Sequence, residues 1–280
     1  SYNKGNNWIL LSATPGDVWM DYVPVFIANG FVRNKSDFIR KHVVYKSYMK
    51  YPVVDYYIGE AVLEMYRKKI QVKMDVERHT TRHREYIYCD YDKSLYKQIV
   101  TERFNFIENL PIQTASEMTQ LLRRVVNASD DRINKVKELL GNLDKVIIFY
   151  NYVYEKEILL KIIKSFKLVH AEWNGQKHEP IPTTDKWVYL VQYTSGSEGW
   201  NCIETNHIIF YSVNYAYRKM EQAEGRIDRV NTSFNDLYYY YLTSNSMVDT
   251  RILKAVAEKK RFNEKAFVED IYGSKDWMNM

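Results

Sequence analysis

The chain has 280 residues, 46% hydrophobic and 27% charged, which is the composition of a soluble globular protein and excludes a disordered one. Two cysteines exclude a disulfide framework, and no apolar run has the length of a membrane span or a secretion signal. The net charge of +5 does not by itself indicate a polyanionic partner. We therefore expect a cytoplasmic protein with no membrane association.

Near the start of the chain, an apolar run at residues 8–11 is followed by Ser12-Ala-Thr-Pro15. This pattern predicts a buried strand that ends in a turn, and a short helix or a turn region rich in apolar groups is expected over 17–27. Residues 31–127 have mostly helical periodicity, and only 84–89 has the character of a strand.

Positive charge is concentrated in two stretches of this helical region. Residues 33–50 hold six Lys or Arg against one acid, and 67–84 hold seven against two, so each carries +5. Basic stretches interleaved with aromatics are typical of a grip on a nucleic-acid backbone, which makes Arg67, Lys68 and Lys69 candidate DNA contacts. The alternative is a solvated helix face.

From residue 145 the pattern alternates between strands and helices. Strands are predicted at 146–150, 168–171, 187–191, 207–212 and 237–242. Helical segments between several of them predict an α/β fold with a parallel sheet and ligands at the carboxyl ends of its strands. The connection between Leu168 and Val191 contains Pro180 and Pro182 and is too short for a full helical crossover.

Two further segments follow predicted strands. Ser195-Gly-Ser-Glu-Gly-Trp-Asn201 is either a ligand-contacting loop or a flexible surface turn. Gln222-Ala-Glu-Gly-Arg-Ile-Asp-Arg229 presents two arginines whose planar forks match phosphate oxygens. The alternative for these arginines is pairing with Glu224 and Asp228 on a surface helix.

Other constellations are weaker. His79, His83 and Cys89 have the spacing of metal ligands, but neighbouring arginines would repel a cation, so no metal site is predicted. Ser197 lacks the Gly-x-Ser-x-Gly context of a hydrolase nucleophile. The tyrosines at 238–241 should alternate between core and surface of a strand.

Taken in order, Ser12–Pro15, Lys145–Phe149, Ser195–Asn201 and Gln222–Arg229 resemble motifs III, IV, V and VI of superfamily 2 helicases, most closely the Swi/Snf-type double-stranded DNA translocases. The resemblance implies a RecA-like lobe, a parallel sheet flanked by helices, preceded by a mostly helical insertion. It implies the tail of a first lobe at 1–30, a basic protrusion at 31–127 and a second lobe at 128–280. Residues 247–260 resemble the bracing helix of that group.

The resemblance also implies roles for residues. Arg226 and Arg229 would stabilise charge on the transferred phosphoryl group of ATP from an exposed cleft, and Gln222 would orient nucleotide or water. Glu198, Gly199 and Asn201 would contact the nucleotide. Ser12 and Thr14 would couple the two lobes. Thr194 and Ser195 would contact DNA, mainly the duplex backbone.

No glycine is followed by lysine and no Asp-Glu pair occurs, so the chain lacks the P-loop and the usual magnesium-binding motif II. We therefore expect the C-terminal part of a longer motor, inactive alone, with ATP and Mg²⁺ held mainly by a missing N-terminal RecA-like lobe. The alternative is a non-catalytic module that binds DNA or a protein.

Overall fold

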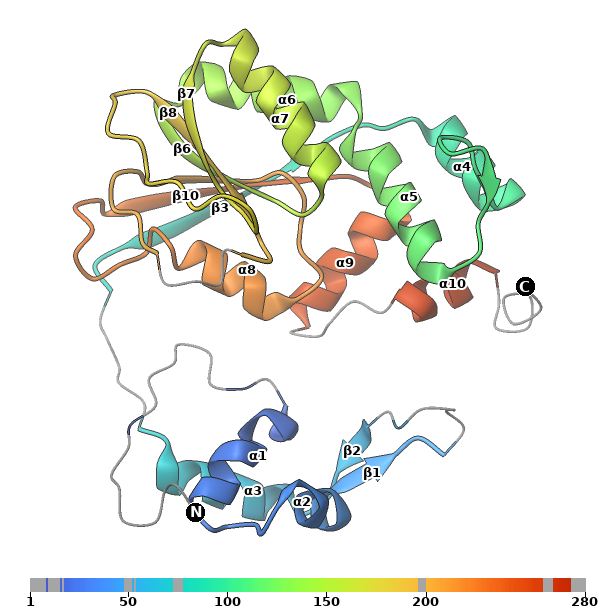
Figure 1. The fold of residues 1–280 in the computed structure, drawn as a ribbon, viewed down its shortest axis with the longest axis vertical. Helices are drawn as coiled ribbons and strands as arrows, with labels where there is room; N and C mark the ends of the chain where they lie inside the picture. Colours follow the sequence, from blue (N-terminus) through green and yellow to red (C-terminus); the bar gives the residue numbers. More distant parts are fainter. Residues whose placement is uncertain are drawn as a thin grey trace. The chain divides into compact units, whose positions relative to one another are not determined.

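The computed structural model describes residues 9, 16, 18–47, 52, 54–72, 78–195, 200–258 and 264–272. The chain divides into two compact units, 1–77 and 78–280, and each is described by itself (Figure 1). The division differs from the protrusion expected over 31–127. Strand β3 (Thr81–Tyr88) belongs to the second unit because it pairs along its whole length with β10 (Asp236–Thr243).

The second unit, called unit 2 below, is built on a six-stranded sheet with the strand order β3-β10-β9-β6-β8-β7. Every pair of neighbouring strands is parallel. The remaining strands are β6 (Lys145–Tyr150), β7 (Val169–Trp173), β8 (Trp187–Gln192) and β9 (His207–Phe210). The predicted α/β class with a parallel sheet is confirmed, and each predicted strand from 84–89 onward lies in this sheet.

Helices cover both faces of the sheet, as burial of a parallel sheet requires (Figure 1). One face carries α6 (Asp130–Asn142) and α7 (Val153–Ser165). The other carries α5 (Ala115–Asn127), α8 (Tyr217–Glu224), α9 (Met247–Ala257) and α10 (Glu264–Tyr272). Before α5 come α4 (Lys93–Glu102) and the short antiparallel strands β4 (Phe104–Asn105) and β5 (Leu110–Pro111). Helix α9 covers most of the segment expected as a bracing helix and buries Val248 and Ile252 in the core.

The tyrosine run of β10 alternates between the faces, as predicted. Tyr239 and Tyr241 are buried on the face that carries α8 and α9, whereas Tyr238 and Tyr240 are partly exposed. The short crossover is also confirmed, because residues 174–186 connect the parallel neighbours β7 and β8 without a helix.

Unit 1 contains α1 (Trp19–Ala28), α2 (Lys35–His42), β1 (Val43–Tyr45), β2 (Val54–Tyr57) and α3 (Glu60–Ile70). Phe26, Phe38 and Leu63 are fully buried and form the centre of its small core. Of the two alternatives for 17–27, a short helix or a turn region, the structure has the helix α1. The antiparallel pair β1–β2 was not predicted, because such short strands give no detectable alternation. No helix in the described residues is long and apolar enough to cross a membrane.

Two side-chain caps position a buried ion pair at the carboxyl ends of the strands. Ser129 caps α6 and Ser246 caps α9, each accepting a backbone hydrogen bond from the residue three positions on. Those residues are Arg132 and Asp249, whose side chains pair at 3.1 Å. Arg132 is fully buried and also donates to the carbonyl oxygens of Tyr211 at 2.6 Å and Leu242 at 3.1 Å. One guanidinium therefore joins α6 and α9 to the ends of β9 and β10.

We expect Arg132→Ala to lower the free energy of unfolding by about 3–5 kcal/mol, because it removes the positive partner of the buried Asp249 carboxylate and a donor to two carbonyl oxygens. Urea unfolding followed by tryptophan fluorescence measures the loss. Arg251→Ala is the matched control, since it removes a half-exposed partner of Asp270 and should cost less than about 1 kcal/mol. Equal losses in the two variants would contradict the assigned role of Arg132.

Candidate functional site

The motif VI segment, Gln222–Arg229, begins on the last turn of α8 and continues as a turn beyond it. Gly225 has φ −65°, an ordinary helical value, so backbone geometry does not require a glycine there. The hydroxyl of Tyr239 donates to the carbonyl oxygen of Glu224 at 3.0 Å, which fixes the end of α8 on β10. From Glu224 the segment runs along β3 toward the beginning of that strand.

The carboxylate of Glu224 is buried and held by the edge strand β3. Arg84 binds it with two hydrogen bonds, Nε to Oε1 at 2.9 Å and Nη2 to Oε2 at 2.6 Å. Arg82 adds a bond to Oε2 at 2.8 Å, and Tyr241 donates its hydroxyl to Oε1. Burial alone would raise the pKa of Glu224, but these donors, led by Arg84, lower it below its usual value.

Asp228 is held in the same way, nearer the start of β3. Arg82 donates from Nε at 2.7 Å, Thr80 donates its hydroxyl at 2.7 Å, and Arg78 forms an ion pair with Oδ2. Burial opposes ionisation here as well, yet Thr80 and Arg82 keep the pKa of Asp228 below its usual value. We call Arg78, Arg82, Arg84, Glu224 and Asp228 the arginine–carboxylate cluster. Glu224 and Asp228, which the alternative interpretation paired with Arg226 and Arg229, therefore bind arginines of β3.

Arg226 lies between these two carboxylates in sequence and contacts the end of motif V. It is 6% exposed, its Nη1 donates to the carbonyl oxygen of Trp200 at 2.8 Å, and its guanidinium lies 5.3 Å from the centre of the Trp200 ring. The backbone N–H of Cys202 donates to the carbonyl oxygen of Arg226 at 3.0 Å. The expected exposed position of Arg226 is therefore wrong, because packing against Trp200 buries the side chain.

Arg229 is partly buried and follows Asp228 directly. Burial and the positive charge of Arg229 lower the pKa of Arg226 to about 10. Burial and the charge of Arg78 lower the pKa of Arg229 as well. The arginine–carboxylate cluster together with Arg226 and Arg229 contains five guanidinium groups and two carboxylates. An anion placed beside Arg226 and Arg229 would offset the repulsion between arginines that contributes to lowering both pKa values.

The motif V loop, Ser195–Asn201, is described only at its two ends. Trp200 is buried against Phe149 and Tyr189, whereas Asn201 is exposed beside it. Motifs V and VI thus meet at Trp200 and Arg226. The predicted nucleotide contacts Glu198 and Gly199 lie outside the described residues, as do the coupling residues Ser12 and Thr14. Gln222 lies on α8, three residues before Gly225, and is partly buried.

The predicted DNA contacts Thr194 and Ser195 follow β8 after one residue, Tyr193, at the carboxyl edge of the sheet. Thr194 is exposed, and the Ser195 carbonyl oxygen accepts a bond from Trp173 Nε1 at 3.1 Å. A polar network organised by buried Glu155 lies at this edge. Its carboxylate accepts bonds from the Asn151 backbone at 2.7 Å and the Ser212 hydroxyl at 3.0 Å, which joins the ends of β6 and β9. Glu155 of α7 thus holds the ends of β6 and β9 together at the same edge of the sheet where motif V begins.

In unit 1 the three predicted basic contacts differ from one another. Lys68 and Lys69 are exposed on the last turn of α3. Arg67 pairs with Glu64 at 2.7 Å and lies over the Trp19 ring, and the bond to Glu64 raises its pKa. Lys68 and Lys69 are therefore better placed than Arg67 to meet a polyanion.

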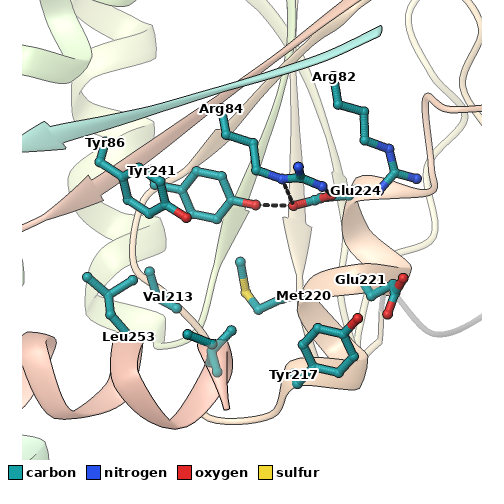
Figure 2. Close-up of a pocket in the computed structure, with 12 residues that line it drawn as sticks. Arg82, Arg84, Tyr86, Val213, Tyr217, Met220, Glu221, Glu224, Tyr241 and Leu253 are labelled. Atoms are coloured by element: carbon teal, nitrogen blue, oxygen red, sulfur yellow. Dashed lines mark hydrogen bonds and ion pairs between the residues drawn. The ribbon is translucent and has the colours of Figure 1, made fainter. Parts of the chain in front are cut away.

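A pocket of about 210 Å³ opens beside the arginine–carboxylate cluster (Figure 2). Arg84 and Tyr241 form one wall, and Tyr217, Met220 and Glu221 of α8 form another. Figure 2 shows Arg84 and Tyr241 both pointing at Glu224 across the top of this pocket. No group of three or more His, Cys, Asp or Glu side chains in the described part of the chain is arranged to hold a metal ion.

Sequence reasoning missed the partners of the motif VI carboxylates. Arg78, Arg82 and Arg84 were considered only as charges of a basic stretch and as the neighbours of His79 and His83 that would repel a cation. The alternation within 81–88 would have indicated that Arg82 and Arg84 share one face of a strand, but no local pattern indicates that Glu224 lies opposite them.

No protein-family model matches the chain. The RAD54-like DNA repair and recombination protein of Gallus gallus is 20% identical over 185 residues, which cover 61% of this chain and 25% of the relative. An uncharacterised ATP-dependent helicase of Mycoplasma genitalium, MG018, is 22% identical over 307 aligned residues, which cover 96% of this chain and 28% of the relative. The chain thus spans about a quarter of the length of these curated relatives.

Among solved structures, the C-terminal part of the Fun30 ATPase domain matches with a TM-score of 0.54 and 14% identity. The match covers 70% of this chain and 98% of the Fun30 fragment. The six-stranded parallel sheet of this chain, with helices on both faces, matches a RecA-like lobe, so the predicted fold is confirmed. Together these matches confirm that the chain resembles the C-terminal part of Swi/Snf-like superfamily 2 helicases.

Proposed function

We propose that this chain is the second lobe of an ATP-driven DNA translocase, in which Arg226 and Arg229 stabilise charge on the transferred phosphoryl group. One observation carries the proposal: both arginines lie in a segment whose two carboxylates are bound by arginines of β3 and whose Arg226 contacts the end of motif V. The likeness to an ATP-dependent helicase and to a DNA repair protein supports it further.

The side chains fit a phosphate group, because guanidinium forks match phosphate oxygens and keep their charge at neutral pH. When bound, ATP supplies the phosphoryl group and Mg²⁺ neutralises part of its charge. Arg226 is oriented by its bond to the Trp200 carbonyl oxygen, and Arg229 adds a second positive charge. Gln222, one turn of α8 before Arg226, would orient the nucleotide or water, and Asn201 would add a contact from motif V. Glu198 and Gly199 remain predicted contacts of the same loop.

The phosphate cradle and the carboxylates for Mg²⁺ would come from a P-loop lobe, because these 280 residues contain neither motif. Closure of the two lobes around ATP and their opening after hydrolysis would move the DNA contacts relative to each other. Thr194 and Ser195 would grip the duplex backbone from unit 2, and Lys68 and Lys69 from unit 1.

We expect Arg229→Ala, in a protein that joins this chain to its P-loop lobe, to lower the rate of ATP hydrolysis about 10³-fold, or roughly 4 kcal/mol of transition-state stabilisation. Arg226→Lys should lower the rate of ATP hydrolysis by a similar factor, since an ammonium lacks the planar fork. The rate of DNA-stimulated phosphate release measures the effect of both substitutions. The rate is expressed per folded molecule, because a substitution of the buried Arg226 can also lower stability. Arg251→Ala is the control and should hydrolyse ATP normally. Near-normal rates in both test variants would withdraw the catalytic assignment.

The 280-residue chain by itself should bind nucleotide weakly and hydrolyse no ATP above background, because phosphate affinity in such motors resides mainly in the P-loop. Phosphate release at micromolar protein with saturating ATP and duplex DNA tests this expectation. Addition of the separately purified P-loop lobe should raise the rate. Robust turnover by the chain alone would contradict the two-lobe proposal. No turnover with the lobe present would favour a non-catalytic binding module.

We expect duplex DNA binding to be largely independent of sequence and to weaken steeply with salt. Each phosphate contact contributes about 0.9 to the slope of log K against log salt, so Lys68→Glu with Lys69→Glu should flatten that slope by up to about 2. Arg67 is left intact because it is paired with Glu64. Lys161→Glu with Lys164→Glu on α7, both exposed, reverses the same number of charges as a control. An equal change of slope in both double variants would assign Lys68 and Lys69 to a solvated helix face.

A further inference from the structure

We propose that Arg82 and Arg84 of β3 are positioning residues for ATP hydrolysis, acting through Glu224 and Asp228 to hold Arg226 and Arg229 in their working geometry. This inference rests on the proposed function and names residues outside the helicase motifs. It begins from a geometric fact: the carboxylates two residues before and two residues after Arg226 are both bound by β3.

The bonds restrain the segment in more than one direction. Arg84 binds Glu224 through two donors, a geometry that fixes orientation as well as distance. Arg82 binds both carboxylates, with Nη1 2.8 Å from Glu224 and Nη2 2.5 Å from Asp228. A single planar group therefore sets the spacing between the two residues that flank Arg226. Because the carboxylates point to β3, the intervening Arg226 is directed to Trp200 of motif V.

These ion pairs are buried enough to enforce the geometry. The side chains of Glu224 and Asp228 are 8% and 2% exposed, and that of Arg82 is 20% exposed. A carboxylate in such a place is costly unless it keeps its partners, so the segment is not free to move away from β3. Strand β3 is itself fixed, since it pairs with β10 from Thr81 to Tyr88.

The arginine–carboxylate cluster also limits pairing of Glu224 and Asp228 with Arg226 and Arg229, their neighbours in sequence. If Glu224 and Asp228 were available to their neighbours in sequence, they would compete with phosphate for Arg226 and Arg229. Their engagement by Arg78, Arg82 and Arg84 orients both carboxylates toward β3 and thereby weakens this competition. The lowered pKa of Arg226, caused by burial and by Arg229, agrees with this arrangement.

The test uses the protein that joins this chain to its P-loop lobe. We expect Arg84→Ala to lower kcat for ATP about 10- to 100-fold, as displacement of a catalytic group by about an ångström does, with a much smaller change in KM. Affinity for ADP with aluminium fluoride, which mimics the transferring phosphoryl group, should fall by a similar factor while ADP affinity holds. Arg84→Lys should restore only part of the rate, since it cannot bind Glu224 through a fork.

Lys177→Ala is the matched control at the opposite edge of the sheet. Lys177 is likewise a half-exposed cation on a buried carboxylate, that of Glu172, at 2.9 Å, and Glu172 keeps Lys156 as a second partner. Lys177→Ala should lose about as much thermal stability as Arg84→Ala and retain kcat. The exchange variant Arg84→Glu with Glu224→Arg should recover activity relative to either single change.

The outcomes separate the two proposals. If Arg229→Ala abolishes hydrolysis and Arg84→Ala keeps full kcat per folded molecule, the positioning role is wrong and the proposed function stands. Equal losses of kcat in Arg84→Ala and Lys177→Ala would also overturn the positioning role, since only general destabilisation would remain. If Arg229→Ala and Arg226→Lys are both fully active, both proposals fail.

Discussion

The pairing of the β3 arginines with Glu224 and Asp228 is the interaction on which the candidate site depends. It joins residues about 140 positions apart in sequence, and it replaces the water that two buried carboxylates would otherwise require. Arg82 and Arg84 lie in register with Leu237 and Tyr239 of β10, on the face of the sheet where Tyr239 and Tyr241 also bind Glu224, so their side chains reach the motif VI segment directly. The sheet thereby fixes a turn that has no regular secondary structure of its own.

The same arrangement concentrates positive charge at a cost. Arg226 and Arg229 lie close enough to lower the pKa of Arg226 further, and Arg78 acts in the same sense on Arg229. Such repulsion destabilises the folded chain, and buried arginines elsewhere offset it by joining elements: Arg132 binds β9, β10 and α9, and Arg123 donates to the Val213 carbonyl oxygen at 2.8 Å. Repulsion between cations at a functional site, with stabilising contacts elsewhere, is the pattern expected of a site prepared for an anion.

The sheet was predictable because its central strands are continuous apolar runs bounded by polar turns, as at 146–150 and 187–191. The side chains that organise the site were not. Arg123 and Arg132 occur in amphipathic helices, where arginine normally faces water, and only tertiary packing reveals that both are buried. Motif VI identified Arg226 but not the direction in which its side chain points, because that direction depends on which residues bind Glu224 and Asp228. Long-range ion pairs leave no periodic signal in a sequence.

The motif V loop connects the two functional surfaces proposed for unit 2. Its first residue, Ser195, lies at the carboxyl edge beside Thr194, and its penultimate residue, Trp200, packs against Arg226. Both ends rest on the last residue of β7, since Trp173 donates to the Ser195 carbonyl oxygen at 3.1 Å and its ring lies 6.3 Å from that of Trp200. A shift of Ser195 on binding a DNA backbone would act on the same tryptophan that contacts Trp200, and Trp200 in turn orients Arg226 through its carbonyl oxygen. The proposed DNA contact and the proposed arginine finger are thus linked through two tryptophans: Trp173 binds Ser195 by a hydrogen bond and contacts the Trp200 ring, and Trp200 contacts Arg226.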